Sequence, residues 1–300
     1  MVCVDHREDS EAAVVWAARE ATARGVPLAI VHVESVRLHP CFSTRDTQSL
    51  LASFVERAAV NHPSLVVGSE LRFGAWKAQL AELSASAQLL VVEKGAADRD
   101  LAAPGSVVDD LLDAPLHCPL VIVPALSLVP EGSPARVVVG LLTESGESDR
   151  AVLLAAARAA DLRASVLDLV VSRPWPASER QRSARPLWSA LDNDVVVVRA
   201  RYPLLSVSIC FDHTPGLELL KAQAVGAELV VVNLLAAGAA TGTAGARTLA
   251  AEQTRATLCP VMVVPDRSGA VPGHFPAASG QPSSAAAAGP SVRHLEPASS

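Results

Sequence analysis

The sequence has few lysines and few aromatic residues, and each shortage restricts what the protein can be. Only Lys77, Lys94 and Lys221 are lysines among 300 residues, and the formal net charge is −6. A broad surface for the phosphate backbone of a nucleic acid is therefore not expected. Aromatic residues make up 3% of the chain, whereas 50% of the residues are hydrophobic. A core built from Ala, Val and Leu suits a parallel sheet covered by Ala-rich helices.

The sequence also lacks the marks of a secreted or membrane-bound protein. Its five cysteines, at positions 3, 41, 118, 210 and 259, are an odd number with no metal-ligand spacing, which argues against a disulfide framework. The start, MVCVDHRED, has neither the basic residues nor the apolar segment of a signal peptide. Prolines interrupt the longest nearly apolar run, APLHCPLVIVPALSLVP, so it predicts a strand and a linker instead of a membrane helix. We expect a cytoplasmic protein with no membrane partner.

An internal duplication organises the chain. HCPLVIVP recurs as LCPVMVVP, with the cysteines at 118 and 259, which is a spacing of 141 residues. AQLLVV recurs as AELVVV, starting at 87 and 227, and DSEAAVVWAAREA recurs as ESDRAVLLAAARAA. Three matches in the same order at nearly one spacing predict two homologous domains, 1–126 and 135–265. The Pro-, Gly-, Ser- and Ala-rich segment 266–300 predicts a disordered tail.

Strands and helices alternate within each copy. In the first copy we expect strands at 2–5, 27–33, 65–73, 89–92 and 120–124. Between them we expect helices over 10–24, 46–61 and 75–85, and a further helix that begins at Gly105. This order predicts an α/β fold of two tandem, doubly wound, parallel five-stranded sheets of Rossmann-like type. Ligands of such sheets bind at the carboxyl ends of the strands.

One segment has conflicting signals. DVVVVRARYP (194–203) favours a strand by its β-branched residues, but the duplication aligns it with FVERAAVNHP (54–63), which favours a helix. Because tertiary context often overrides propensity, we predict a helix.

Four features resemble one known family when they are taken together and in order. The first strand ends in Asp5, and it is followed by a Ser-x-x-Ala-x-x-Trp-Ala helix that starts at Ser10. The second strand ends in His32-Val33, and Cys-Pro introduces the last strand. This pattern resembles the universal stress protein family in its tandem two-domain form. The resemblance implies an adenine-nucleotide alpha-hydrolase-like fold and antiparallel pairing between the last strands of the two copies. The chain would then be an intramolecular pseudo-dimer, and further homodimerisation is not required.

The resemblance also implies a site for ATP or a related adenine nucleotide in the first copy. Asp5 and Val33 match the residues that line the family's adenosine pocket. The family's phosphate loop has the pattern G-x-x-G-x(9)-G-[ST], and its later part is matched here. The implied loop residues are Lys94, Gly95, Gly105, Ser106 and Val107.

The loop departs from the family pattern at its start. The first glycine is missing, because its place falls on Val92 or Glu93. Carboxylates at Glu93, Asp98 and Asp100 repel a polyphosphate unless they point into solvent, which is the more usual arrangement for loop carboxylates. If Glu93 lies near the phosphates, Glu93→Gly is expected to tighten ATP binding. The second copy has Leu142 in place of the Asp and no loop motif, so it is expected to be degenerate.

Several of these residues have ordinary structural alternatives. Asp5 can cap the turn after its strand, and Ser106 can belong to a helix start that has no ligand. Cys118 and Cys259 are expected to be small buried residues packed against the sheet. His32 is expected to be a satisfied core histidine, and no histidine pair has the spacing of a metal site.

Two functions therefore remain open, together with a third that has less support. The first is a regulatory protein in stress adaptation that binds ATP or a related adenine nucleotide through its first domain. The second is a degenerate scaffold or interaction module that binds no nucleotide. The third is an ATPase or nucleotide transferase, but no base, nucleophile or metal-ligand set is recognised, so we do not expect an enzyme. The short first strand, MVCVD, is either short in the protein or continues from an upstream start.

Overall fold

The computed structural model describes part of the chain, and both copies are represented in it. The described residues are 1–4, 10–34, 44–94, 112, 114–125, 135–141, 146–172, 184–212, 216–233 and 258–265. Residues Met1–Ser268 form one compact unit. The predicted helix at Gly105 and the predicted tail 266–300 lie outside the described residues.

The elements of each copy follow the predicted alternation of strands and helices. The first copy contains β1 (Val2–Val4), α1 (Glu11–Arg24), β2 (Leu28–Glu34), α2 (Thr44–Asn61), β3 (Val67–Phe73), α3 (Trp76–Ser86), β4 (Leu90–Lys94) and β5 (Leu120–Pro124). The second copy contains β6 (Arg136–Leu141), α5 (Gly146–Leu162), β7 (Val166–Ser172), α6 (Ala184–Arg201), β8 (Val207–Asp212), α7 (Gly216–Ala224), β9 (Leu229–Asn233) and β10 (Val261–Val264).

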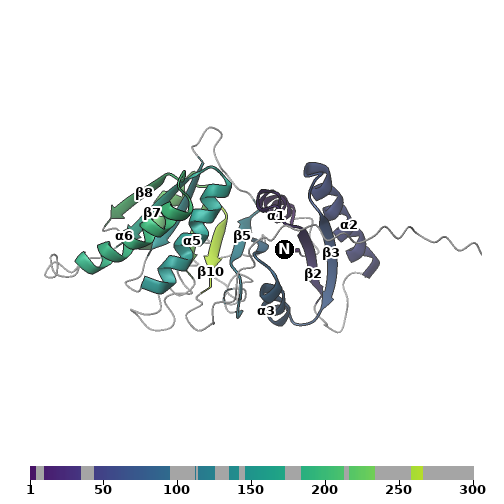
Figure 1. Ribbon diagram of the computed structural model, residues 1–300. Helices are drawn as coiled ribbons and strands as arrows, with labels where there is room; N and C mark the ends of the chain where they lie inside the picture. The colour runs from purple at the N-terminus through teal and green to yellow at the C-terminus, as the bar shows by residue number, and fades with distance from the viewer. Residues whose placement is uncertain are drawn as a thin grey trace, which may run out of the picture. The chain divides into compact units, whose positions relative to one another are not determined.

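The described strands form one sheet of two parallel halves. Its strand order is β3-β2-β1-β4-β5-β10-β9-β6-β7-β8 (Figure 1). Within each half all pairings of the described strands are parallel, which confirms the predicted α/β fold. The halves join where β5 and β10 pair antiparallel, with Ile122 opposite Val261 and Leu120 opposite Val263. This is the pairing that the resemblance implied.

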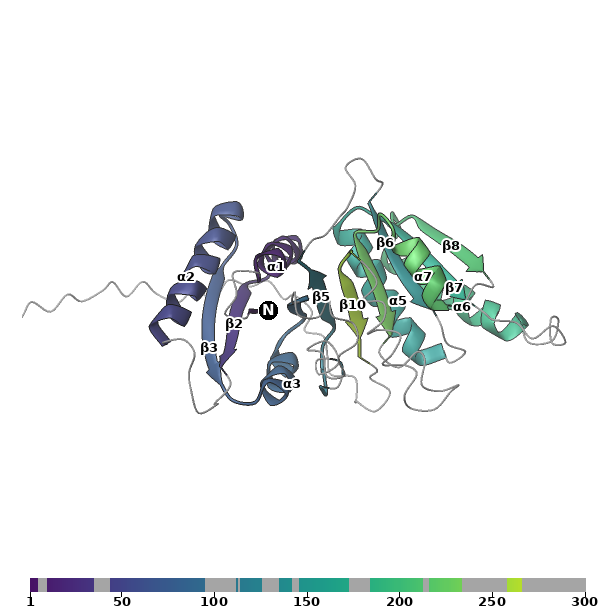
Figure 2. The same ribbon diagram turned by 180° about the vertical axis from the view of Figure 1, so that it is seen from behind.

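Helices cover both faces of the sheet. One apolar cluster contains residues of α1, α2, α5 and α6, and it includes side chains of both copies. A second cluster lies on the other face and contains residues of α3 and α7 (Figures 1 and 2). We call these the α1 face and the α3 face of the sheet.

Helix α1 shows how sequence determines these layers. Ala13, Val14, Ala17, Ala18 and Ala21 are buried, and their spacing of three or four residues places them on one side of the helix. The helix ends at Gly25, whose φ of 65° is the left-handed conformation that glycine adopts without steric cost. Helix α5 ends two residues before Ala164, which takes the same conformation with φ 50°.

Two predictions about individual segments are confirmed. Residues 194–201 belong to α6, although they carry four consecutive valines. Cys118 and Cys259 are buried, with 2% and 5% of their surface exposed. Burial against the sheet was therefore the correct interpretation of the repeated cysteines.

Candidate functional site

The candidate site lies at the carboxyl edge of the first half-sheet. Strand β1 pairs with β2 on one side and with β4 on the other, so the chain reverses its direction of winding at β1. In doubly wound sheets, ligands bind outside the carboxyl ends of the strands at this switch point. The carboxyl ends concerned are Val4, Glu34 and Lys94.

Two of the predicted nucleotide-binding residues are described, and both lie at this edge. Val33 is 8% exposed and packs in the apolar cluster of the α3 face. Lys94 ends β4 and is half-buried; it follows Val92 by two residues, and Val92 belongs to the same α3-face cluster. Because strand side chains alternate, Lys94 shares the face of Val33.

The other predicted site residues belong to segments that the structure does not describe. Asp5, Gly95, Gly105, Ser106 and Val107 lie outside the described residues, as do Asp98, Asp100 and Leu142. Of the predicted site, the structure therefore describes Val33 and Lys94, which lie on one face of the sheet at its carboxyl edge.

The carboxylate of Glu93 does not point into solvent, in contrast to the prediction. It is half-buried in β4, and its Oε2 accepts a hydrogen bond of 3.1 Å from the backbone N–H of Ala13 in the first turn of α1. Ser10 occupies the N-cap position, but its side chain makes no capping hydrogen bond. Glu93 thus supplies the acceptor that a capping side chain ordinarily provides, and its negative charge faces the positive end of the helix dipole.

This contact changes how Glu93 affects an anion at the edge. Since Glu93 is directed to the α1 face, it lies on the opposite side of β4 from Lys94. The start of α1 is already occupied by a carboxylate of the protein. A bound phosphate would therefore depend on the other predicted helix start, at Gly105.

His32 is a core histidine, as predicted. It is 3% exposed, and its Nδ1 lies 2.8 Å from the carbonyl oxygen of Val4. A carbonyl oxygen can only accept, so Nδ1 carries the hydrogen and donates it. The Nε2 atom lies 3.6 Å from Oε2 of Glu34. His32 thereby fixes the end of β1, directly before Asp5.

The second copy replaces these polar contacts with different residues. Val4 is opposite His32 in the first copy, whereas Leu141 is opposite Val171 in the second. The residue that corresponds to Glu93 is Asn233, which is the last residue of β9 and is 2% exposed. The second edge therefore lacks both the histidine and the carboxylate of the first.

Cys3 lies in the interior of this half-sheet and does not have the surroundings of a reactive thiol. It lies on β1 and is 4% exposed. Burial raises the pKa of its thiol to about 12. The thiol is therefore protonated at neutral pH and is a poor nucleophile.

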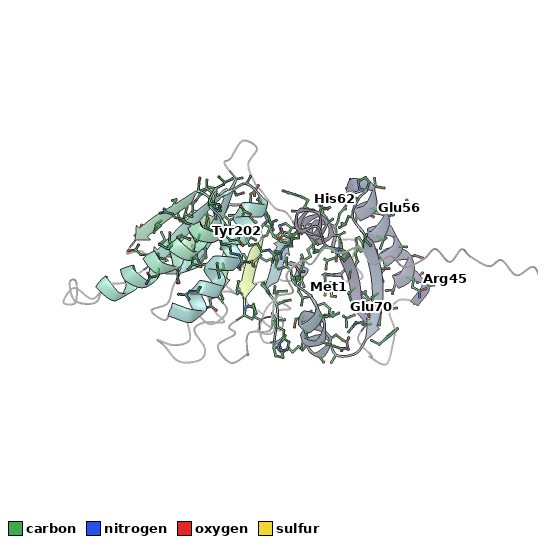
Figure 3. All side chains as sticks on the ribbon, viewed as in Figure 1. Met1, Arg45, Glu56, His62, Glu70 and Tyr202 are labelled. Carbon is green, nitrogen blue, oxygen red and sulfur yellow. The ribbon has the colours of Figure 1, made fainter. Side chains whose placement is uncertain are left out.

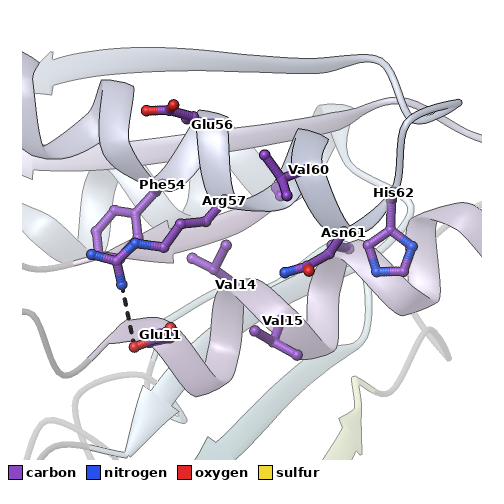
Figure 4. Close-up of a pocket in the computed structure, with 11 residues that line it drawn as sticks. Glu11, Val14, Val15, Phe54, Glu56, Arg57, Val60, Asn61 and His62 are labelled. Atoms are coloured by element: carbon purple, nitrogen blue, oxygen red, sulfur yellow. Dashed lines mark ion pairs between the residues drawn. The ribbon is translucent and has the colours of Figure 1, made fainter.

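A groove between α1 and α2 is a feature that sequence reasoning missed. It has a volume of about 290 Å³, and Figure 4 shows Val14, Val15 and Phe54 along it. Arg57 pairs with Glu11 across it at 3.2 Å (Figure 4). None of the predicted nucleotide-binding residues lines this groove. It joins elements about 40 residues apart in sequence, so no local pattern marks it.

Within the described ranges, no group of three or more His, Cys, Asp or Glu side chains could hold a metal ion. No described helix is both long enough and apolar enough to cross a membrane.

Comparison with known proteins identifies the fold. No protein-family model and no curated protein matches the chain. A universal stress protein from Archaeoglobus fulgidus DSM 4304 aligns with 88% of this chain and 95% of its own, at 14% identity and a TM-score of 0.64. A protein of unknown function from Pseudomonas aeruginosa PAO1 aligns with 88% of this chain and 91% of its own, at 15% identity and a TM-score of 0.58. The chain therefore has a universal stress protein-like fold across both copies.

Proposed function

We propose that the chain is a universal stress protein-like regulatory protein in stress adaptation that binds ATP or a related adenine nucleotide through its first domain. One observation carries the proposal. The switch-point edge of the first half-sheet places Val33 and Lys94 on one face, and in the sequence Lys94 directly precedes the pattern Gly95-x(9)-Gly105-Ser106. The cytoplasmic location and the absence of catalysis are parts of the same proposal.

Each described residue has a definite role in this proposal. Val33 would supply apolar surface for the adenosine, since its side chain already packs on the α3 face. The ammonium group of Lys94 would attract the phosphates. The N–H groups at Gly105-Ser106 would hold them, as free N–H groups at a helix start hold anions.

The placement of Glu93 supports binding in two ways. Its hydrogen bond to Ala13 directs the carboxylate away from the face of Lys94. The helix dipole of α1 also compensates part of its negative charge. An acidic residue at position 93 is therefore compatible with a bound polyphosphate.

Equilibrium dialysis with labelled ATP tests the proposal. We expect saturable binding of one nucleotide per chain, because the second copy lacks the motif. Gly105→Asp should abolish binding, since it adds bulk and negative charge at the predicted phosphate-facing helix start. Lys94→Gln should weaken binding by about tenfold, which corresponds to about 1.4 kcal/mol.

A matched control separates the site from a general effect of the substitution. Gly68→Asp makes the same chemical change on the exposed strand β3, where an added Cβ meets nothing within 4 Å. It should leave ATP binding unchanged. ATP recovered intact after incubation would agree with a protein that is not an enzyme. If the unmodified chain shows no saturable binding up to millimolar nucleotide, the degenerate scaffold is the correct alternative.

A further inference from the structure

Strand β8 forms one outer edge of the sheet, and among the described strands it pairs with β7 alone. It ends the strand order of the second copy, beside α6 (Figures 1 and 2). The N–H of Leu167 in β7 donates to the carbonyl oxygen of Ser206 at 2.9 Å. Because backbone groups alternate in direction along a strand, those of Val207 and Ile209 point away from β7. An edge of this kind is a template for a further strand.

The other outer edge, β3, occupies the equivalent place in the first copy. In each copy the residue after the helix donates its N–H to the carbonyl four residues earlier, His62 after α2 and Tyr202 after α6 (Figure 3). The inner neighbours β2 and β7 then donate to the carbonyls of Val66 and Ser206 in the same way. Both pairs are related by a shift of 140 residues, from 62 to 202 and from 66 to 206. The two edges can therefore be compared residue by residue.

The edge of the first copy carries charges, and the edge of the second does not. Glu70 and Arg72 lie in β3 and form an ion pair at 2.8 Å. Charged side chains on an edge strand hinder its pairing with a further strand. The segment 202–211 contains no Asp, Glu, Lys, Arg or His. The edge at β8 therefore lacks this protection.

Exposed apolar side chains accompany the uncharged edge. Leu204, in the turn between α6 and β8, is 94% exposed, and Val196 and Ile209 are 64% and 38% exposed. At the shift of 140 residues, the equivalent residues of the first copy are polar, namely Ser64, Glu56 and Ser69. Val66 and Phe73 of the first copy are also exposed, but they flank the charged pair of β3.

Val196 and Ile209 lie on the outer side of the second copy. Val207 packs against the α1-face cluster, so Ile209, two residues further along β8, points to the same face. Helix α6 covers that face, and its Asp194 pairs with Arg150 of α5 at 2.7 Å. Val196 follows Asp194 by two residues, which is about 200° around the helix, and therefore faces away from α5.

We propose that β8 is an interface at which a second copy of this chain adds its own β8 in the antiparallel direction, so that the sheet continues across a twofold axis. A twofold axis places a surface against itself, and the segment 202–211 has no charge that would then meet a like charge. The chain also joins its own homologous half-sheets by antiparallel edge pairing, between β5 and β10. The charges of β3 limit the assembly to a closed pair, since a filament would need β3 as the second edge.

Sedimentation equilibrium of the full chain tests the proposal, because it measures the molar mass and the Kd of the dimer. At high protein concentration we expect twice the 31.1 kDa of one chain. Ile209→Lys places a charge on the open edge and should leave only the mass of one chain. Ser69→Lys is the matched control, since it places the same charge at the equivalent position of β3 and should keep the doubled mass. Nucleotide binding plays no part in this test.

A second variant keeps the test decisive if circular dichroism shows that Ile209→Lys does not fold. Leu204→Ser introduces the residue of the first copy at a position that is 94% exposed, so the fold of one chain does not depend on it. It should raise the Kd of the dimer at least about tenfold, because one apolar side chain is lost from each subunit.

Several results would overturn the proposal. One is the mass of a single chain at every concentration, and another is an unchanged Kd in Leu204→Ser. A folded Ile209→Lys that keeps the doubled mass would place the interface elsewhere, as would a Ser69→Lys that loses it. A mass that rises beyond two chains would indicate head-to-tail pairing of β8 with β3 instead of a closed dimer.

Discussion

Glu93→Ala is the substitution that most directly tests the contact between β4 and α1. It removes the acceptor 3.1 Å from the N–H of Ala13, and Ala13 is fully buried, so water cannot readily replace the carboxylate. Loss of an N-terminal capping interaction costs roughly 0.5–2 kcal/mol. Loss of a negative charge at the helix start costs roughly 0.3–1 kcal/mol more. We therefore expect the free energy of unfolding to fall by about 2 kcal/mol.

Glu93→Gln separates the two contributions. Its amide oxygen can still accept the hydrogen bond, but the charge is lost, so we expect about half of the effect of Glu93→Ala. Thermal unfolding followed by circular dichroism should show Tm lower by roughly 4–8 °C for Glu93→Ala. Hydrogen exchange should show a specific loss of protection at the Ala13 amide. Glu56→Ala, which removes an exposed carboxylate of α2, should change stability by less than about 0.5 kcal/mol.

Two results would refute this reasoning. The first is an unchanged Tm in Glu93→Ala, equal to that of Glu56→Ala. The second is a loss of stability without any change in exchange at Ala13, since that would place the effect of Glu93 elsewhere. The expected loss also bears on Glu93→Gly, because that substitution removes the same acceptor from the start of α1. Any gain in ATP affinity must then be measured below the unfolding temperature of that variant.

Two further predictions follow from buried charges and from a buried thiol. Glu20→Ala should lower the free energy of unfolding by roughly 3–5 kcal/mol, because Arg24 and Arg163 are 8% and 12% exposed and lose their shared carboxylate. Glu11→Ala breaks an exposed pair and should cost less than about 1 kcal/mol in urea unfolding; equal costs would contradict the argument. Burial raises the pKa of Cys3 from 9.0 to about 12, so the unfolded thiol loses its proton first as the pH rises. Its contribution to stability should fall by about 1.4 kcal/mol per pH unit between those values, and Cys3→Ala should show no such term.

The fold was predictable from sequence because its signals are either local or repeated. Helix α1 follows from the spacing of its alanines and from Gly25, both of which are visible within a single segment. The helix over 194–201 was not visible locally, since its valines favour a strand. It was predictable only because the aligned segment of the first copy has an unambiguous helical pattern.

The candidate site was predictable only in part, for a physical reason. Val33 and Lys94 could be placed because strand ends in a parallel sheet meet at one edge. The contact between Glu93 and Ala13 joins residues 80 positions apart, and that between Glu20 and Arg163 joins residues 143 positions apart. No periodicity or spacing rule identifies which carboxylate caps which helix at such separations. The order of strands and helices determines which elements lie side by side. Side-chain packing determines which residues of those elements form contacts.

The antiparallel pairing of β5 with β10 lies within one chain. The pairing therefore does not depend on the protein concentration, and it allows the sequences of the two copies to diverge. In a dimer of separate chains, the corresponding interface would dissociate on dilution. Here the two edges are covalently linked, so each experiences the other at a fixed effective concentration whatever the amount of protein. In a dimer of identical chains, every substitution is also present in both subunits. In this chain Asn233 can replace the equivalent of Glu93 on one side while Glu93 remains on the other. One edge is thus free to change its chemistry while the central strand pairing keeps the other edge intact.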